Sequence, residues 1–232
     1  MGGRPSLKDQ AYAYIRDAIV SGELEDGSQH SVYRLADHLG ISRTPTREAV
    51  LQLAEAGLVT VERNRGIRIH GITVADIRDI FELRLLIEVP ATAYAAVNGD
   101  DDFVSAMRSE ASAMESSTVA HDDERFKAHD RALHDHIISV LNNGRMSSTL
   151  GGLRDVTRAH GAWTGHNTRD VRDIMAEHEL IVEALAARDP KRASDAMRTH
   201  LIRTGTLLME QIAPRTGEQI DPAWWHRLES SL

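Results

Sequence analysis

The chain has 232 residues, of which 41% are hydrophobic and 27% are charged, enough apolar material for one large domain or two smaller ones. This composition excludes a disordered chain, and the absence of an apolar run of about 18 residues argues against a membrane-spanning helix. Cysteine is absent, which excludes disulfides and thiolate metal sites. Because the first residues also lack the apolar segment of a secretory signal, we expect a cytoplasmic protein.

The net charge of −8 is unevenly distributed along the chain. Residues 1–70 contain nine basic and nine acidic side chains, so the remainder carries the whole negative charge. Within 42–68 the basic residues outnumber the acidic ones. A neutral N-terminal part with a local basic face is compatible with DNA binding through that part alone.

Apolar residues at helical spacing predict a helix over 7–20 and a short second helix over about 31–39. Gly40 follows the second helix as a left-handed C-cap, and Ser42 is a suitable N-cap for a third helix that Gly57 stops. Two helices joined by a tight glycine turn have the spacing of a helix-turn-helix motif.

Residues 58–62 and 66–70 alternate apolar and polar side chains, which predicts two strands of a β-hairpin with arginines at its tip, as in a DNA-binding wing. The start of the third helix is predicted to expose side chains that suit guanine, phosphate or a thymine methyl. These are Arg43, Thr44, Thr46 and Arg47. The alternative interpretation is a solvated helix start with ordinary surface charge.

The segment LADHLGISRTPTREAVLQLAEAGLVTVERNRGIRI resembles the DNA-binding domain of GntR-type bacterial transcription regulators. The resemblance implies a homodimer that reads a pseudo-palindromic duplex operator. Two departures leave the operator sequence open: Asp26-Gly27 replaces a common Pro-Gly, and Tyr33 stands where a charged residue is frequent. The residues implied to contact DNA are Ser42, Arg43, Thr44, Thr46 and Arg47 in the helix, and Arg63, Asn64, Arg65 and Gly66 in the wing.

From Thr73 onward the pattern is helical, with Thr73 and Asp76 at capping-box spacing and Pro90 predicted to interrupt the first helix. Short connections predict an antiparallel bundle, so the expected fold is mostly α, a winged helix-turn-helix followed by an all-α bundle. The expected domains are 1–71, 72–213 and a tail, 214–232, whose Trp224-Trp225 pair is more suited to burial than to function. Further helices are predicted at about 91–97, 100–117, 121–140, 144–164, 168–187 and 190–213.

Four residues of this part have metal-ligating chemistry. Asp130 and His134 lie one helical turn apart on one face, whereas His178 and His200 lie in helices near apolar core positions. Three imidazoles and a carboxylate suit a divalent ion with an open side for a ligand carboxylate. On the residues alone, chance spacing and ordinary surface or core histidines remain an alternative.

The stretches ELRLLIE and EHELIVEALAARDPKRASDAMRTHL resemble the FCD-type effector domain of the FadR/VanR branch of the same family. This resemblance extends over roughly 73–212 and implies that Asp130, His134, His178 and His200 bind a divalent metal ion, with zinc, nickel or manganese expected. It also places Arg84 near the effector pocket. Arg154 and Arg158 are further candidates for pairing with an effector carboxylate, or else surface arginines.

The favoured hypothesis is therefore a transcription regulator, more often a repressor in this family, whose operator affinity responds to a small carboxylate at the metal. A second hypothesis keeps the DNA-binding regulator and makes the metal purely structural. A third hypothesis is a metal-dependent hydrolase fused to a DNA-binding module. The only candidate general base for such an enzyme is Glu177, beside His178, and at that position its side chain is expected to point away from the ligand site.

Overall fold

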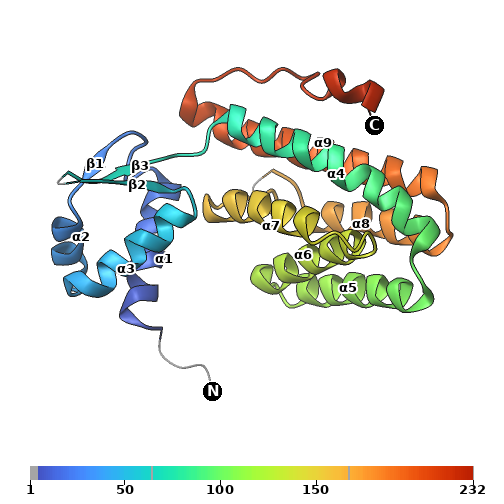
Figure 1. Cartoon of the computed structure of the whole chain (residues 1–232), viewed down its shortest axis with the longest axis horizontal. Helices are drawn as coiled ribbons and strands as arrows, with labels where there is room; N and C mark the ends of the chain where they lie inside the picture. The colour runs from blue at the N-terminus through green and yellow to red at the C-terminus, as the bar shows by residue number, and fades with distance from the viewer. Residues whose placement is uncertain (1–4, 64, 167, 232) are drawn as a thin grey trace. The chain divides into compact units, whose positions relative to one another are not determined.

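The computed structural model describes residues 5–63, 65–166 and 168–231, and the contacts within it divide the chain into two compact units (Figure 1). The first unit consists of the chain up to Ile72 together with residues 153–162. The second consists of residues 73–152 and the chain from Trp163 onward. Ten residues that the sequence assigns to the second domain thus group with the first unit.

Three helices build the first unit: α1 (Leu7–Ser21), α2 (Val32–Leu39) and α3 (Arg43–Glu55). Helix α1 begins with a capping box between Ser6 and Asp9, and α2 ends at Gly40, which has a left-handed conformation as the sequence predicts. Their apolar faces enclose one core with the strands that follow. This core contains Ile15, Ile19, Leu35, Val50, Leu53, Leu58, Ile67 and Ile69.

The strands form a three-stranded antiparallel sheet in the order β1-β3-β2, with β1 (Gln29–His30), β2 (Val59–Glu62) and β3 (Gly66–Ile69). The β2–β3 hairpin pairs Val61 with Ile67 and Glu62 with Gly66, which confirms the predicted wing. Gly66 has a φ of +96°, and a Cβ atom there would collide with the His30 carbonyl. Only glycine fits this point, because the antiparallel strand β1 lies directly beside it. The two-residue strand β1 was not predicted, since it is too short to show a periodic pattern.

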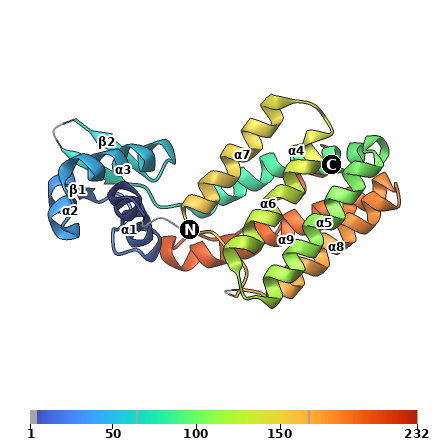
Figure 2. The same ribbon diagram turned by 90° about the horizontal axis from the view of Figure 1, so that it is seen from below.

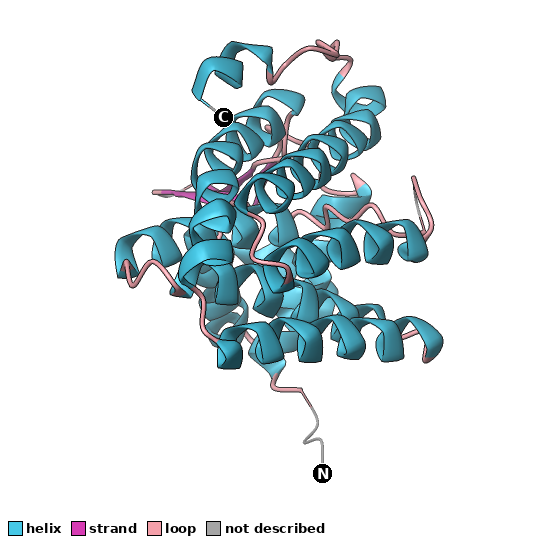
Figure 3. Cartoon of the chain, turned by 90° about the vertical axis from the view of Figure 1, so that its right-hand side faces the viewer, coloured by secondary structure: helices cyan, strands magenta, loops and turns pink. Residues whose placement is uncertain are grey.

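The second unit is a helical bundle of α4 (Val74–Asn98), α5 (Asp101–Val119), α6 (Asp123–Ser139), α8 (Val171–Ala186) and α9 (Pro190–Thr216). Helix α7 (Gly144–Ala159) begins in this unit and ends in the segment that groups with the first. Helices α4 and α9 run antiparallel side by side (Figure 1), and α5 packs against α6 and α8 (Figure 2). In the described part of the chain, strands occur only near the wing (Figure 3).

The predicted break at Pro90 is wrong, because α4 continues through Pro90 to Asn98 and no separate helix covers 91–97. Proline removes one hydrogen bond from a helix, but the long contact of α4 with α9 keeps the axis continuous. The capping box of Thr73 and Asp76 is confirmed. Helix α7 stops at Ala159, short of the predicted 164, and α9 extends beyond the predicted 213 to Thr216.

The C-terminal tail packs on the second unit. Its 3₁₀ helix η1 (His226–Ser231) follows Trp224, which is 3% exposed and donates from Nε1 to Thr206 Oγ1 at 3.1 Å. The Val74 amide donates to Glu218 at 2.9 Å, and Arg227 pairs with Glu82. Among the helices described by the structure, none is both long and apolar enough to cross a membrane.

We expect Trp224→Ala to destabilise the protein by about 3–5 kcal/mol, because it empties a buried aromatic site against Gly205 and α9. The matched control is Trp225→Ala, which removes a half-buried ring and should cost about 1 kcal/mol or less. Urea denaturation followed by circular dichroism measures both. Equal losses for the two variants would contradict the packing described for the tail.

Candidate metal centre and DNA-binding surface

Three histidines from three helices meet inside the second unit. His134 on α6, His178 on α8 and His200 on α9 are buried, and a set of ring nitrogens, one from each, lies within 4.8 Å of one another. Asp130 is one turn before His134 on α6, and its Oδ1 lies 3.0 Å from Nε2 of His178. The structure therefore brings together all four residues that the sequence singles out as metal ligands.

Each imidazole is held through Nδ1. The Nδ1 atom of His134 lies 2.6 Å from Glu88 Oε2, that of His200 lies 2.8 Å from Glu177 Oε2, and that of His178 lies 2.8 Å from the Ile174 carbonyl. A carbonyl or carboxylate oxygen can only accept, so each neutral ring carries its proton on Nδ1. The Nε2 lone pairs of His134 and His200 are then available for a metal ion, whereas Nε2 of His178 lies against Asp130 and would have to lose any proton that it shares with that carboxylate.

Two glutamates that the sequence analysis did not assign to the site support the ligands, and arginines hold both. Arg84 donates from Nε to Glu88 at 2.7 Å, four residues apart on α4. The i, i+4 spacing of Arg84 and Glu88 was a signal for this pair. Arg84, which the family resemblance places near the effector pocket, is buried and forms an ion pair with Glu88. Glu177, considered only as a base, accepts instead from the Nδ1–H of His200.

Arg169 and Arg203 both bind Glu177, but from different environments. Arg169 donates from Nη1 to both carboxylate oxygens at 2.7 and 2.8 Å, and its side chain is 3% exposed. Its remaining groups donate to Thr164 Oγ1 and Thr204 Oγ1. Arg203 donates to Glu177 at 2.9 Å with 49% of its side chain exposed. Arg169 thus joins α8 and α9 to the loop that precedes α8.

The electrostatics differ between the ligands, because burial alone would lower the pKa of His178 but its contact with Asp130 raises it, so metal binding there would displace a proton. Burial and the neighbouring His178 lower the pKa of His200 to about 3, so this ring is neutral near pH 7. Burial alone would raise the pKa of Asp130, but its hydrogen bond with His178 holds that pKa well below its usual range. A neutral imidazole and an ionised carboxylate are the protonation states that a divalent metal requires.

These donors fit a divalent ion. Nitrogen and oxygen ligands without sulfur are suited to zinc, nickel or manganese, and each ring already has the outer partner that fixes its orientation.

Arg154 is buried and Arg158 is exposed, and both lie in the segment 153–162 that groups with the first unit. Their effector-binding role stays a prediction.

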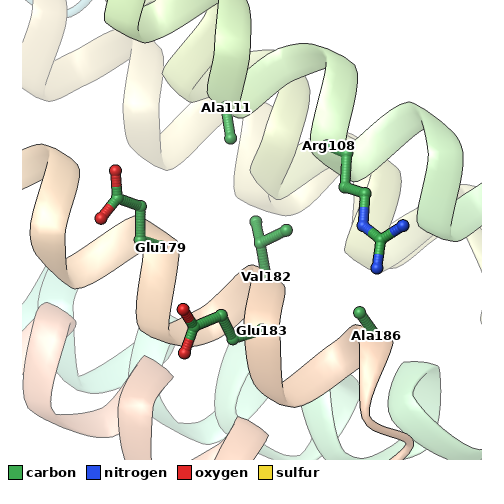
Figure 4. A pocket seen from close by; sticks show the side chains of 6 residues that line it. All are labelled: Arg108, Ala111, Glu179, Val182, Glu183 and Ala186. Carbon is green, nitrogen blue, oxygen red and sulfur yellow. The ribbon is translucent and has the colours of Figure 1, made fainter.

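An open depression of about 240 Å³ lies elsewhere, on the outer side of the bundle. Figure 4 shows that α5 and α8 line it from opposite sides. The six residues that line it include none of the four predicted ligands, and its two glutamates face solvent beside one arginine. They are Arg108, Ala111, Glu179, Val182, Glu183 and Ala186.

The predicted DNA-binding residues lie at the start of α3 and in the wing. Ser42, Arg43, Thr44 and Arg47 are exposed, and the Ser42 hydroxyl makes no capping hydrogen bond. The expectation that Thr46 is exposed is wrong. Thr46 is 0% exposed and donates its hydroxyl to the Ser42 carbonyl at 3.0 Å, because it lies on the buried side of the first turn.

In the wing, Arg63 and Arg65 are exposed and Gly66 is half-buried beside β1. Asn64 lies outside the described residues. The exposed arginines of α3 and of the wing belong to one compact unit, on elements that a single core holds together.

Comparison with known proteins identifies both parts of the chain. Residues 7–69 match the family described as bacterial regulatory proteins of the gntR family, and residues 79–203 match the FCD domain. An HTH-type transcriptional regulator of Streptomyces ambofaciens is 31% identical over 86% of this chain and 83% of its own. The gluconate operon transcriptional repressor of Bacillus licheniformis is 26% identical over 75% and 74%. The E. coli McbR/YncC structure superposes with a TM-score of 0.63 at 20% identity, covering 90% of this chain and 99% of that one.

We expect Arg169→Met to destabilise the protein by about 3–5 kcal/mol, because it removes a fully buried partner of a buried carboxylate. Arg203→Met removes a half-exposed partner of the same carboxylate and should cost about 1 kcal/mol or less. Urea denaturation of the two variants gives the comparison. A larger loss for Arg203→Met would contradict the dominant role of Arg169.

Proposed function

The chain belongs to the GntR family of DNA-binding transcription regulators and carries an FCD domain, and we propose that it is a repressor controlled by a small carboxylate bound at a divalent metal ion. Members of this family are regulators and not enzymes, so a hydrolase is not proposed. Relatives that include a gluconate operon repressor support the repressor assignment.

The buried histidine triad is the observation on which the metal proposal rests. Asp130, His134, His178 and His200 would hold the ion, and Glu88, Glu177 and the Ile174 carbonyl fix the orientation of the three rings. When bound, the ion supplies a Lewis-acidic centre to which a carboxylate can bind. The protein residues orient that centre, and the burial of all three histidines places it in the interior of the second unit.

At the first unit, we propose direct contact with duplex DNA in the cytoplasm. Arg43 and Arg47 can make bidentate contacts with guanine from the N-terminal end of a recognition helix, and Ser42 and Thr44 can bind phosphate. The wing arginines, Arg63 and Arg65, suit the flanking minor groove or backbone, next to Gly66 and Asn64. Burial of Thr46 removes it from this set.

A homodimer is proposed through the outer face of α4. This helix is apolar on two sides: one packs against the bundle, while the other exposes large apolar residues at helical spacing. A self-complementary contact between two copies of this face buries both stripes and supplies the two-fold symmetry that a pseudo-palindromic operator needs. The exposed residues are Leu83, Leu86, Tyr94 and Val97.

Regulation then follows from differential binding. A carboxylate at the metal can change operator affinity only if it binds one arrangement of the dimer more tightly than another. Thermodynamic linkage requires that operator DNA weakens carboxylate binding by the same factor. This reciprocity distinguishes an effector from a ligand that merely stabilises the fold.

The test uses full-length protein purified without chelator, and duplexes of 30 base pairs selected by it from a random pool. We expect about one divalent ion per chain by elemental analysis, lost in His178→Ala and retained in His136→Ala, a half-buried histidine of α6 that lies near Glu110 and outside the triad. Glu177→Gln should weaken zinc binding about 10- to 100-fold, because the Nδ1–H of His200 loses its anionic acceptor. A sugar acid, a dicarboxylate and an aromatic acid are then added as probes, and operator affinity is followed by fluorescence anisotropy.

Each result is decisive for one part of the proposal. No bound ion and no uptake on titration would reject the four-residue site. An ion whose removal lowers the melting temperature, with operator affinity insensitive to every acid, would favour a purely structural metal. Operator affinity that is unaffected by salt would exclude DNA recognition by the arginines.

The dimer is tested by substituting Leu86→Glu, which should shift the protein to a monomer in sedimentation velocity because two charges would meet across a symmetric apolar contact. Val119→Glu is the matched control, since Val119 is also an exposed apolar residue but lies at the end of α5. A Leu86→Glu variant that remains dimeric would place the interface on another face.

A further inference from the structure

An exposed aromatic ring lies under one of the proposed DNA-reading arginines. The guanidinium carbon of Arg43, in the first turn of α3, is 4.0 Å from the centre of the Tyr33 ring, in the first turn of α2. Tyr33 is 56% exposed, so its ring is not part of the core that Leu35 and Ala36 join from the same helix. The ring therefore contacts Arg43 from the solvent side of the motif.

The Tyr33 ring is the contact available to restrain the Arg43 side chain. Within the part of the chain that the structure describes, no carboxylate forms an ion pair with Arg43, and the stacked ring is its one recorded side-chain partner. A free arginine side chain samples many rotamers, and DNA binding must restrict them. A ring that holds the guanidinium before DNA binds lowers the entropy cost of ordering this side chain during binding.

Stacking and base reading are compatible because they use different parts of the guanidinium. The guanidinium carbon lies over the ring at 4.0 Å from its centre, a distance typical of a cation–π contact made through the flat face of the group. The N–H bonds lie in the plane and point outward from its edge, so they remain able to donate to O6 and N7 of a guanine. An ion pair would instead occupy these N–H groups and compete with the base.

We infer that Tyr33 is a positioning residue for DNA recognition, whose ring holds the Arg43 guanidinium ready for a bidentate contact with a guanine. This inference rests on the proposed contact of Arg43 with DNA. It assigns the effect to the ring and not to the hydroxyl, and it places the effect on specific binding, since a phosphate contact would strengthen binding to any sequence alike.

The experiment is a double-mutant cycle on the full-length protein, with a selected 30-base-pair duplex and a scrambled duplex of equal length as probes. Tyr33→Phe keeps the ring and should retain wild-type affinity. Tyr33→Ala and Tyr33→Leu should weaken binding to the selected duplex about 2- to 5-fold, with no change for the scrambled one. The Tyr33→Ala/Arg43→Ala double variant should bind as Arg43→Ala does, because the ring acts only through the arginine.

Three outcomes would overturn the inference. Additive losses in the double variant would mean that Tyr33 acts independently of Arg43. Equal weakening by Tyr33→Phe and Tyr33→Ala, on both duplexes, would assign the effect to a hydroxyl–phosphate contact. Unchanged affinity in Tyr33→Leu would show that bulk alone suffices. If Arg43→Ala itself leaves affinity unchanged, the proposed DNA contact fails, which is a separate result.

A stability control separates these effects from misfolding. Leu7→Ala removes another exposed apolar side chain of the same unit, at the start of α1, and should leave both affinities unchanged. Thermal denaturation of every variant should match the wild type, since Tyr33 is outside the core.

Discussion

The second unit depends on satisfying the hydrogen bonds of three imidazoles buried at its centre. A buried polar group without a partner costs free energy comparable to a lost hydrogen bond, and here three such groups converge from α6, α8 and α9. Their Nδ1 atoms find acceptors at Glu88, Glu177 and the Ile174 carbonyl. Meeting this demand brings two more charges into the interior, and those charges in turn need partners.

The arginines follow from that second requirement. A buried carboxylate is tolerated when it is paired and fully hydrogen-bonded, and Glu88 and Glu177 each gain an arginine in addition to the imidazole. For Glu177 the requirement reaches further, since Arg169 also binds Thr164 and Thr204. The position of α8 relative to α9 and to the preceding loop is therefore set by the same network that orients His200. The same side chains therefore determine both the helix packing and the geometry of the site, and α4 takes part through Arg84 and Glu88.

The sequence was sufficient to predict the features that depend only on neighbouring residues, such as helix caps, turns and strand alternation. The capping box at Thr73, the left-handed Gly40 and the alternating wing strands are each determined by a few consecutive residues, and the structure has them where the sequence predicts. Pro90 shows the limit, because the packing of α4 on α9 outweighs the lost hydrogen bond. Thr46 is a different kind of error, because its spacing of three and four residues from Ala49 and Val50 already places it on the buried face of α3, although its polar side chain suggested exposure.

The same distinction between local and tertiary information applies to the residues of the candidate metal site. Asp130 and His134 were identified by their spacing on one helix, whereas His178 and His200 could be joined to them only through family resemblance. Glu88 and Glu177 needed the structure, because each contacts a histidine on a different helix from its own. No periodicity in the sequence encodes which helices are neighbours, so side chains that support a ligand across a helix contact remain invisible to it. Arg169 was missed for a further reason, because it lies in a loop whose sequence has no periodic pattern.

The two units use opposite means to hold a functional side chain in place. In the interior, hydrogen bonds to charged partners orient the imidazoles, and a water-poor environment strengthens those bonds. At the DNA-binding surface, water would weaken an ion pair to Arg43, and such a pair would occupy the N–H groups that a base needs. An aromatic face avoids both problems, since it restrains the guanidinium while leaving its edge free. In the proposed DNA contact, the tyrosine at position 33 would restrain Arg43 without neutralising the charge that attracts DNA.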